Sequence, residues 1–205
     1  MAALIVRRTV VGIALLAGVW LVWPLVRPRT LPPSGRPWLV VLDGYHRLDR
    51  ALVLQRQPAT AGWPILLITC PRTEQPTPAQ RAQAAGPLEV LLEGIDTAAQ
   101  AAALARWLEQ QPFTSRPARI WLLSDQHHFP RALWAAQLAV GGLGVAVEPV
   151  PVDADAPRLL VDPWSFRQLG PAWRDALRLQ LWRLSGSTGA WLDPAAMRSK
   201  QDACW

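Results

Sequence analysis

Short, unbroken runs of apolar residues alternate along the chain with longer segments in which apolar residues recur every three or four positions. The first pattern is typical of strands buried on both faces, and the second is typical of amphipathic helices. The runs predict strands at residues 38–42, 65–69, 88–93, 120–124 and 145–152. The helical spacing predicts helices at residues 45–57, 97–111, 130–140 and 164–184, with a short Ala- and Gln-rich helix after the second strand.

Buried strands that alternate with helices indicate a parallel sheet covered by helices on both faces. We therefore expect residues 38–190 to form a doubly wound, Rossmann-like α/β domain, a three-layer sandwich with about five mostly parallel strands. Residues 191–205 would form a C-terminal tail. Ligands of such sheets bind beyond the carboxyl ends of the strands, so that edge is where functional side chains are expected.

The N-terminal part of the chain has a different pattern. Residues 9–26 carry no charge and are just long enough to span a bilayer, with Trp20 and Trp23 near one end, where interfacial aromatic residues are found. No small residues suitable for signal-peptide cleavage follow them. We therefore expect residues 1–8 to be a short tail and residues 9–26 an uncleaved transmembrane signal anchor in contact with the lipid bilayer. The Pro-rich residues 27–37 would be an extended spacer.

The net charge of the chain limits the kinds of molecule that it is expected to bind. The chain has 21 Lys and Arg against 15 Asp and Glu, a net charge of +6 that suits nucleic acid, anionic lipid or an anionic substrate. The Arg residues are scattered, and no basic run is interleaved with aromatic residues, so nucleic-acid binding is not expected. Arg residues flank residues 9–26 on both sides in nearly equal number, so charge alone leaves the membrane orientation open.

Polar residues gather where the predicted strands end. The candidates for a pocket at this edge are Gly44, Arg47, Glu93, Asp96, Thr97, Ser124, His128 and Arg131. Pro130 suits the first turn of a helix, whose N–H groups and positive dipole end would face an anion. The sequence therefore predicts a site for an anionic small molecule or a lipid-linked ligand.

The residue types suggest roles in that site. Arg131 and Arg47 would grip the anion, since a guanidinium group can bind a carboxylate or phosphate through two hydrogen bonds. His128 would be the catalytic acid or base, because its imidazole titrates near neutral pH. Ser124, together with the Asp96 and Thr97 pair, would orient the ligand.

Each of these residues also has a purely structural interpretation. His128 could bond the backbone or Asp125 at the start of its helix, and Arg47 could pair with Asp43 or Asp49. Such contacts would stabilise the fold without any ligand.

The residues before the second long helix have similar alternatives. Thr97 and Gln100 match a capping box, and Asp96 is also a common helix cap. Glu93 could be a general base or one side of a salt bridge. Cys70 at a strand end is more typical of a small buried residue than of a nucleophile.

No metal site or dithiol site is expected. The two cysteines, Cys70 and Cys204, do not form a C-x-x-C pair, and no H-x-x-x-H or D-x-D pattern occurs. A disulfide between the two cysteines would join a strand end to the last residues of the chain.

The last predicted helix has two interpretations. Its apolar stripe consists of Trp173, Leu177, Leu181 and Leu184, with Arg residues elsewhere on the helix. The helix could simply pack on the sheet, or its Trp and Arg residues could also touch a bilayer surface.

Three blocks resemble the bacterial YdcF/SanA/ElyC family: VVLDGYHRLDRAL, EGIDTAAQA and LLSDQHHFPRAL. The third is the most specific, because its strand, Ser124, His128 and Arg131 follow the family's order. The resemblance covers roughly residues 38–152 and the basic Trp/Leu helix. Asp43 stands where the family usually has Gly, and Thr-Cys-Pro replaces Ser-Gly-Gly after the second strand.

The resemblance implies a single-pass protein of the inner (plasma) membrane, with its domain in the periplasm and a role in cell-wall or envelope-polymer biogenesis. It implies no specific reaction, so enzymatic activity, cofactor and oligomeric state stay open. One alternative is a non-catalytic envelope scaffold with a vestigial pocket, which the missing glycines favour. Another is a nucleotide- or S-adenosylmethionine-binding domain, although no G-x-G-x-x-G turn follows the first strand.

Overall fold

The computed structural model describes residues 35–42, 45–70, 75–124, 128–150 and 166–188, together with Gly12 and Gly18. Within these residues, five strands form one all-parallel sheet in the order β3-β2-β1-β4-β5. The strands are β1 (Trp38–Leu42), β2 (Ile65–Ile68), β3 (Leu88–Leu91), β4 (Arg119–Leu123) and β5 (Ala146–Pro149). The predicted Rossmann-like α/β fold with five parallel strands is confirmed.

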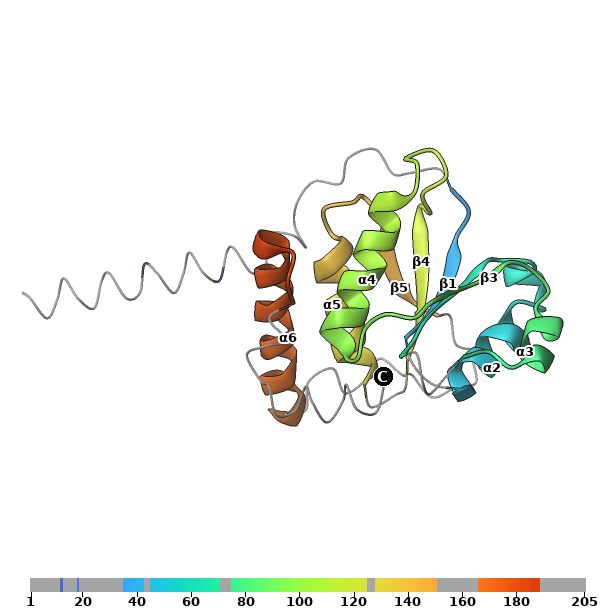
Figure 1. The fold of residues 1–205 in the computed structure, drawn as a ribbon, viewed down its shortest axis with the longest axis horizontal. Coiled ribbons are helices and arrows are strands. Elements are labelled where there is room, and N and C mark those ends of the chain that lie inside the picture. The colour runs from blue at the N-terminus through green and yellow to red at the C-terminus, as the bar shows by residue number, and fades with distance from the viewer. Residues whose placement is uncertain are drawn as a thin grey trace, which may run out of the picture.

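The helices cover both faces of the sheet (Figure 1). They are α2 (Tyr45–Leu54), α3 (Pro78–Gln83), α4 (Thr97–Gln110), α5 (Phe129–Val140) and α6 (Phe166–Ser185), with a short 3-10 helix at Pro58–Thr60. Helices α2 and α3 lie on one face, and α4 and α5 lie on the other, with α6 packed outside α4 and α5. The last predicted helix, α6, therefore forms a further layer outside the three-layer sandwich that the sequence predicts.

The central strand β1 fixes where a ligand can bind. It pairs with β2 on one side and with β4 on the other, and its core residues are almost fully buried. The chain moves from β1 to β2 and β3, then crosses back over the sheet through α4 to β4. The strand order thus reverses between β1 and β4, which is the position where open α/β sheets hold their ligands.

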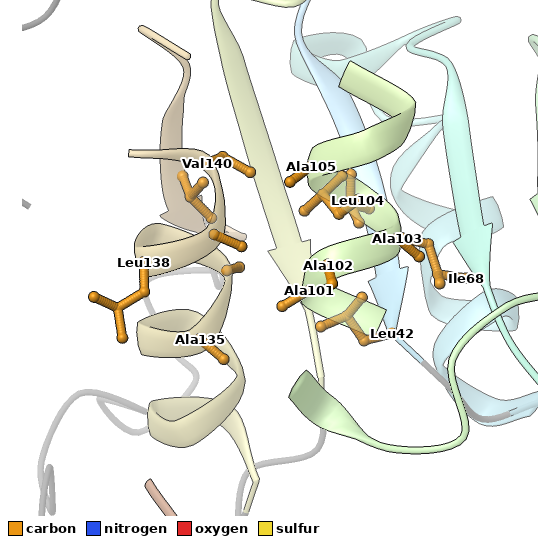
Figure 2. Close-up of a cluster of buried hydrophobic side chains, with 14 of the residues drawn as sticks. Leu42, Ile68, Ala101, Ala102, Ala103, Leu104, Ala105, Ala135, Leu138 and Val140 are labelled. Atoms are coloured by element: carbon orange, nitrogen blue, oxygen red, sulfur yellow. The ribbon is translucent and has the colours of Figure 1, made fainter. Parts of the chain in front are cut away.

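Alanine residues let α4 lie close to both the sheet and α5. Ala101 and Ala105 lie on the side of α4 toward α5, whereas Ala103 lies beside Ile68 of β2 (Figure 2). All three alanines are buried, and alanine is also the best helix former. Since the separation of packed helices depends on the side chains between them, small residues here bring the starts of α4 and α5 close together.

The last helix does not pack on the sheet as one interpretation expected: α6 packs against α4 and α5. Its buried side is formed by Ala172, Ala176, Leu179 and Trp182. Three residues of the apolar stripe face outward instead: Trp173 is 46% exposed, Leu177 54% and Leu184 75%.

The predicted membrane anchor, residues 9–26, lies outside the described residues except for Gly12 and Gly18, whose backbone is helical. None of the helices in the described part of the chain combines the length and apolar character that crossing a bilayer requires. The spacer, residues 27–37, is described only from Gly35 onward, and the C-terminal tail lies outside the described residues.

Gly94 shapes the turn that leads from β3 into α4. Its φ is 88°, and a Cβ atom there would lie 2.7 Å from the backbone nitrogen of Gln100. Gly62 has a similar φ of 68°, but nothing lies within 4 Å of its Cβ position. We therefore expect Gly62→Ala to lower the free energy of unfolding by about 1–2 kcal/mol, the cost of a left-handed alanine. Gly94→Ala should cost clearly more, because the start of α4 must also move.

Urea unfolding of the full chain in detergent micelles measures both values. Equal losses for the two variants would show that α4 shifts without cost, and the close-approach argument would be wrong.

Candidate functional site

A cavity of about 290 Å³ opens at the carboxyl edge of the sheet, between the ends of β1 and β4. Six of the eight predicted site residues line it: Arg47, Asp96, Thr97, Ser124, His128 and Arg131. The remaining lining residues are Leu42, Ile95, Gln100 and Ala132. Four separate segments of the chain therefore meet here, at the point where the strand order reverses.

The other two predicted residues are not part of this lining. Glu93 is half-exposed, and its carboxylate lies 2.6 Å from the guanidinium of Arg106, so its contact in the structure is the salt bridge. Gly44 lies outside the described residues, as do Asp43 and Asp125.

Asp96 begins α4 and is also held by a distant helix. One carboxylate oxygen accepts a hydrogen bond from the backbone N–H of Ala99 at 3.0 Å, so Asp96 is the N-cap residue. The other oxygen accepts from Nη1 of Arg178 in α6 at 2.8 Å. The predicted capping box between Thr97 and Gln100 is therefore wrong, because Thr97 is already the first helical residue. The capping box in the described residues belongs to α3, where Thr77 and Gln80 bond each other reciprocally.

Gln100 is the residue of the cavity that sequence reasoning placed in the wrong role. It is one of the residues that line the cavity and is only 4% exposed, and its buried amide Nε2 has no hydrogen-bond partner among the described residues. A buried amide without a partner costs roughly 1–3 kcal/mol, so such groups are uncommon.

Arg131 is fixed by a buried carboxylate. Its Nε donates to Oδ2 of Asp175 in α6 at 2.5 Å, and the Asp175 side chain is 1% exposed. Among the described residues Arg131 has no other hydrogen-bond partner, so its two terminal nitrogens can donate to a ligand. A guanidinium held through Nε alone keeps the pair of parallel N–H groups that suits a phosphate or carboxylate.

The remaining polar side chains lie nearer the opening. Nη1 of Arg47 donates to the backbone oxygen of Leu42, which ties the arginine to the end of β1. His128 is exposed and is the N-cap residue of α5, with its backbone oxygen accepting from Ala132 at 2.9 Å. Its imidazole has no partner among the described residues and is placed to meet a bound group. Ser124 adds a partly exposed hydroxyl group at the end of β4.

Two helix N-termini face the same space. Asp96 caps α4 through its side chain, whereas the N-cap residue of α5, His128, makes no side-chain cap bond. The dipole of α5 favours negative charge at this end of the helix, which lies at the cavity.

The arrangement has more positive than negative charge. The described residues in or behind the cavity supply three guanidinium groups, from Arg47, Arg131 and Arg178, against the carboxylates of Asp96 and Asp175. Both carboxylates are already bonded by arginines, so neither repels an incoming anion strongly. The N-termini of α4 and α5 lie at the same cavity, and their dipoles favour an anionic ligand.

Cys70 does not supply a nucleophile. It is buried and disulfide-bonded, and the chain has one other cysteine, Cys204, which lies outside the described residues. In the described ranges, no three His, Cys, Asp or Glu side chains gather closely enough to hold a metal ion.

Comparisons with known proteins add no identity: no family model, no curated protein and no solved structure matches the chain. The resemblance to the YdcF/SanA/ElyC family therefore stays a prediction, and the site has to be interpreted from its own geometry.

The sequence held a signal for Asp175 that pattern reasoning passed over. It is the one acidic residue of α6, and it lies between Ala172 and Ala176 on the side of the helix that is buried. A carboxylate on a buried helix face needs a partner, and a pocket arginine is a good one. The sequence does not show which arginine, on which helix, lies opposite Asp175.

Asp175→Ala should be strongly destabilising because it leaves the Arg131 guanidinium largely buried without its partner. We expect a loss of about 3 kcal/mol or more in the free energy of unfolding. The matched control is Glu93→Ala, which removes an exposed ion pair of similar length and should cost about 0–1 kcal/mol. Urea unfolding of the two variants as full chains in micelles measures the difference. If both lose the same amount, the pair to Arg131 does not hold α6 against α5.

Proposed function

We propose that the domain binds a small anionic ligand, of the phosphate-bearing kind, in the cavity between the ends of β1 and β4. The observation that carries the proposal is that Arg47, Arg131 and His128 line one 290 Å³ cavity, and that the terminal nitrogens of Arg131 make no bond to the described residues. An acceptor-rich anion would accept from both terminal nitrogens at once. A phosphate has three or four acceptor oxygens, which matches the donors around the cavity better than a neutral hydroxyl compound does.

The size of the cavity supports a headgroup-sized ligand. Pockets for drug-sized molecules are roughly 300–1,000 Å³, so this cavity is at the lower end of that range. A phosphate with a few attached atoms fits such a volume, whereas a whole nucleotide or S-adenosylmethionine would extend well outside it. The rest of a larger ligand, such as a lipid-linked sugar phosphate, would lie beyond the opening near His128.

We further propose that the protein acts at the cell envelope, tethered to the inner membrane by residues 9–26. The uncharged segment and the Pro-rich spacer support this location, and so does the disulfide of Cys70. Disulfides persist in oxidising compartments such as the bacterial periplasm and are rare in the cytosol. A ligand carried on envelope lipids or polymers would then be within reach, as the family resemblance also suggests.

If the site is catalytic, His128 is the group that would move a proton. It lies at the opening, where a leaving group or a nucleophile on the ligand could approach its imidazole. Arg131 and the start of α5 would hold the anion in place, and Ser124 would orient it. Binding without catalysis needs the same groups except the histidine, so His128→Gln separates the two: a catalyst loses turnover and a scaffold loses nothing.

Exchanging Gln100 for Leu should change stability and affinity in opposite directions. Without ligand, Gln100→Leu removes an unsatisfied buried amide, so the free energy of unfolding should stay equal or rise. Affinity for inorganic phosphate should fall roughly 2- to 10-fold, the worth of one neutral hydrogen bond.

Gln55→Leu is the matched control for that exchange. Gln55 is also buried, but it donates to the backbone oxygen of Trp63 at 2.6 Å and accepts from the backbone nitrogen of Ala85 at 2.8 Å. Its loss should destabilise the fold and leave the affinity of the folded protein unchanged. Urea unfolding and isothermal titration with phosphate read out both quantities. A destabilised Gln100→Leu protein with unchanged affinity would contradict the site.

Arg131→Ala should weaken the binding of inorganic phosphate and of pyrophosphate roughly 10- to 150-fold, because it removes a charge-assisted hydrogen bond worth about 1.5–3 kcal/mol. Arg106→Ala, on the exposed side of α4, should leave both affinities unchanged. Isothermal titration of the full chain in micelles measures these constants.

A double variant tests phosphate binding even if the Arg131→Ala protein does not fold. Arg131→Met with Asp175→Leu removes both buried charges together, so no carboxylate is left unpaired. This protein should fold and still have lost phosphate binding. Wild-type protein that binds neither anion, or a double variant that binds both normally, would rule out the proposed function.

A further inference from the structure

The outer side of α6 carries an unusual concentration of exposed apolar surface. Six large apolar side chains are exposed among the described residues, and three of them, Trp173, Leu177 and Leu184, belong to this one helix. Their spacing of four and seven residues places them along one side of the helix. Trp173 is held in position on its inner edge by Trp134 of α5, at a ring-centre distance of 5.8 Å, while its outer edge faces solvent. We call these residues, together with Arg174, the α6 stripe.

The charge around the α6 stripe has one sign. The only acidic residue of α6, Asp175, is buried against Arg131. Arg178 and Arg183 bond inward, to Asp96 and to the backbone oxygen of Leu138. The Arg174 side chain is 52% exposed beside Trp173, with its Nη2 3.5 Å from Oδ1 of Asp175. The exposed surface of the described part of α6 is thus apolar and cationic, with no carboxylate on it. Helices that lie in a membrane interface combine Trp and Leu with basic residues in this way.

We propose that the α6 stripe lies on the surface of the anionic membrane that carries the protein. The proposal rests on the proposed membrane anchor and adds to it a definite orientation of the domain. Trp173, Leu177 and Leu184 enter the boundary between headgroups and acyl chains, and Arg174 pairs with the phosphates of anionic lipids. Clustered exposed apolar side chains mark a contact surface. The exposed guanidinium of Arg174 beside them favours an anionic lipid surface over a neutral protein surface as the occupant.

The length of the tether supports this occupant. Gly35 is already bonded to the domain, because its backbone nitrogen donates to the oxygen of Arg116 at 3.1 Å, so the tether would be residues 27–34. These would span about 25 Å if fully extended as polyproline, at roughly 3.1 Å per residue. That length is comparable to the diameter of a small domain, so the domain stays next to the bilayer at all times. The high local concentration of lipid means that a modest apolar patch suffices for docking.

Docking through the α6 stripe would also bring the ligand cavity close to the membrane. Asp175, on the inner side of α6, bonds Arg131 of the cavity directly. One helix therefore separates the cavity from the lipid, a distance on the order of 10 Å.

The test uses environment-sensitive labels on the full chain reconstituted in vesicles. Leu184→Cys is labelled with a nitrobenzoxadiazole dye, and Val53→Cys, on α2 at the opposite face of the sheet, is the matched control because Val53 is 59% exposed. Labelling is done without reducing agent, with unlabelled wild-type protein as the background. Vesicles contain phosphatidylethanolamine and phosphatidylglycerol, with a lipid spin-labelled near the headgroup as the quencher.

The proposal predicts a blue shift and quenching by the spin-labelled lipid for the label at position 184, and neither for the label at position 53. Adding Arg174→Glu should reduce the docked fraction several-fold in phosphatidylglycerol vesicles, because each basic residue near an anionic surface contributes to binding. Equal signals at the two positions would overturn the orientation. A blue shift at position 184 without lipid quenching, together with cross-linking between copies, would show that a second copy covers the α6 stripe instead.

Vesicle flotation separates this proposal from the one on which it rests. If the chain floats with the vesicles but position 184 is not quenched, the anchor stands and the docking surface is wrong. If the chain does not float, the anchor itself is wrong, and docking through α6 falls with it. Phosphate titration of the same preparation reports on the cavity independently of both.

Discussion

The candidate site depends on two buried ion pairs that reach from α6 to the starts of two other helices. Asp175 bonds Arg131 at the start of α5, and Arg178 bonds Asp96 at the start of α4. Buried ion pairs add little net stability, because removing the charges from water costs about as much as their attraction returns. Breaking one of them is costly, however, since the remaining charge is left in the interior. The pairs therefore specify one arrangement of the three helices, and the cavity is a product of that arrangement.

This arrangement keeps both carboxylates near the cavity paired. Asp96 accepts a hydrogen bond from Arg178, and Asp175 accepts one from Arg131, so neither would meet a bound anion as an unpaired negative charge. The buried amide of Gln100 has no partner among the described residues, which lowers the stability of the domain.

Helix α6 would connect the ligand cavity with the membrane surface. Its inner side supplies the carboxylate and the guanidinium that hold the cavity, and its outer side presents Trp173, Leu177 and Leu184. Large apolar residues therefore lie on both sides of α6: Leu179 and Trp182 pack against α4 and α5, and Trp173, Leu177 and Leu184 are exposed. Contact of the outer side with lipid would bury the exposed residues.

The sequence by itself determined the alternation of strands and helices, the parallel sheet and the edge at which polar residues gather, because buried strands and helix faces leave periodic patterns that need no knowledge of their neighbours. It also pointed to Arg131, His128 and Arg47, since residues after parallel strands share one edge. Only the tertiary structure decided that Asp96 rather than Thr97 caps α4, that Gln100 lacks a partner, and that Glu93 pairs with Arg106 outside the cavity. It also decided which side of α6 is buried. The stripe of Trp173, Leu177 and Leu184 is exposed, whereas Ala172, Ala176, Leu179 and Trp182 pack against α4 and α5, because the buried side of a helix depends on the surfaces of its neighbours and no single segment encodes those.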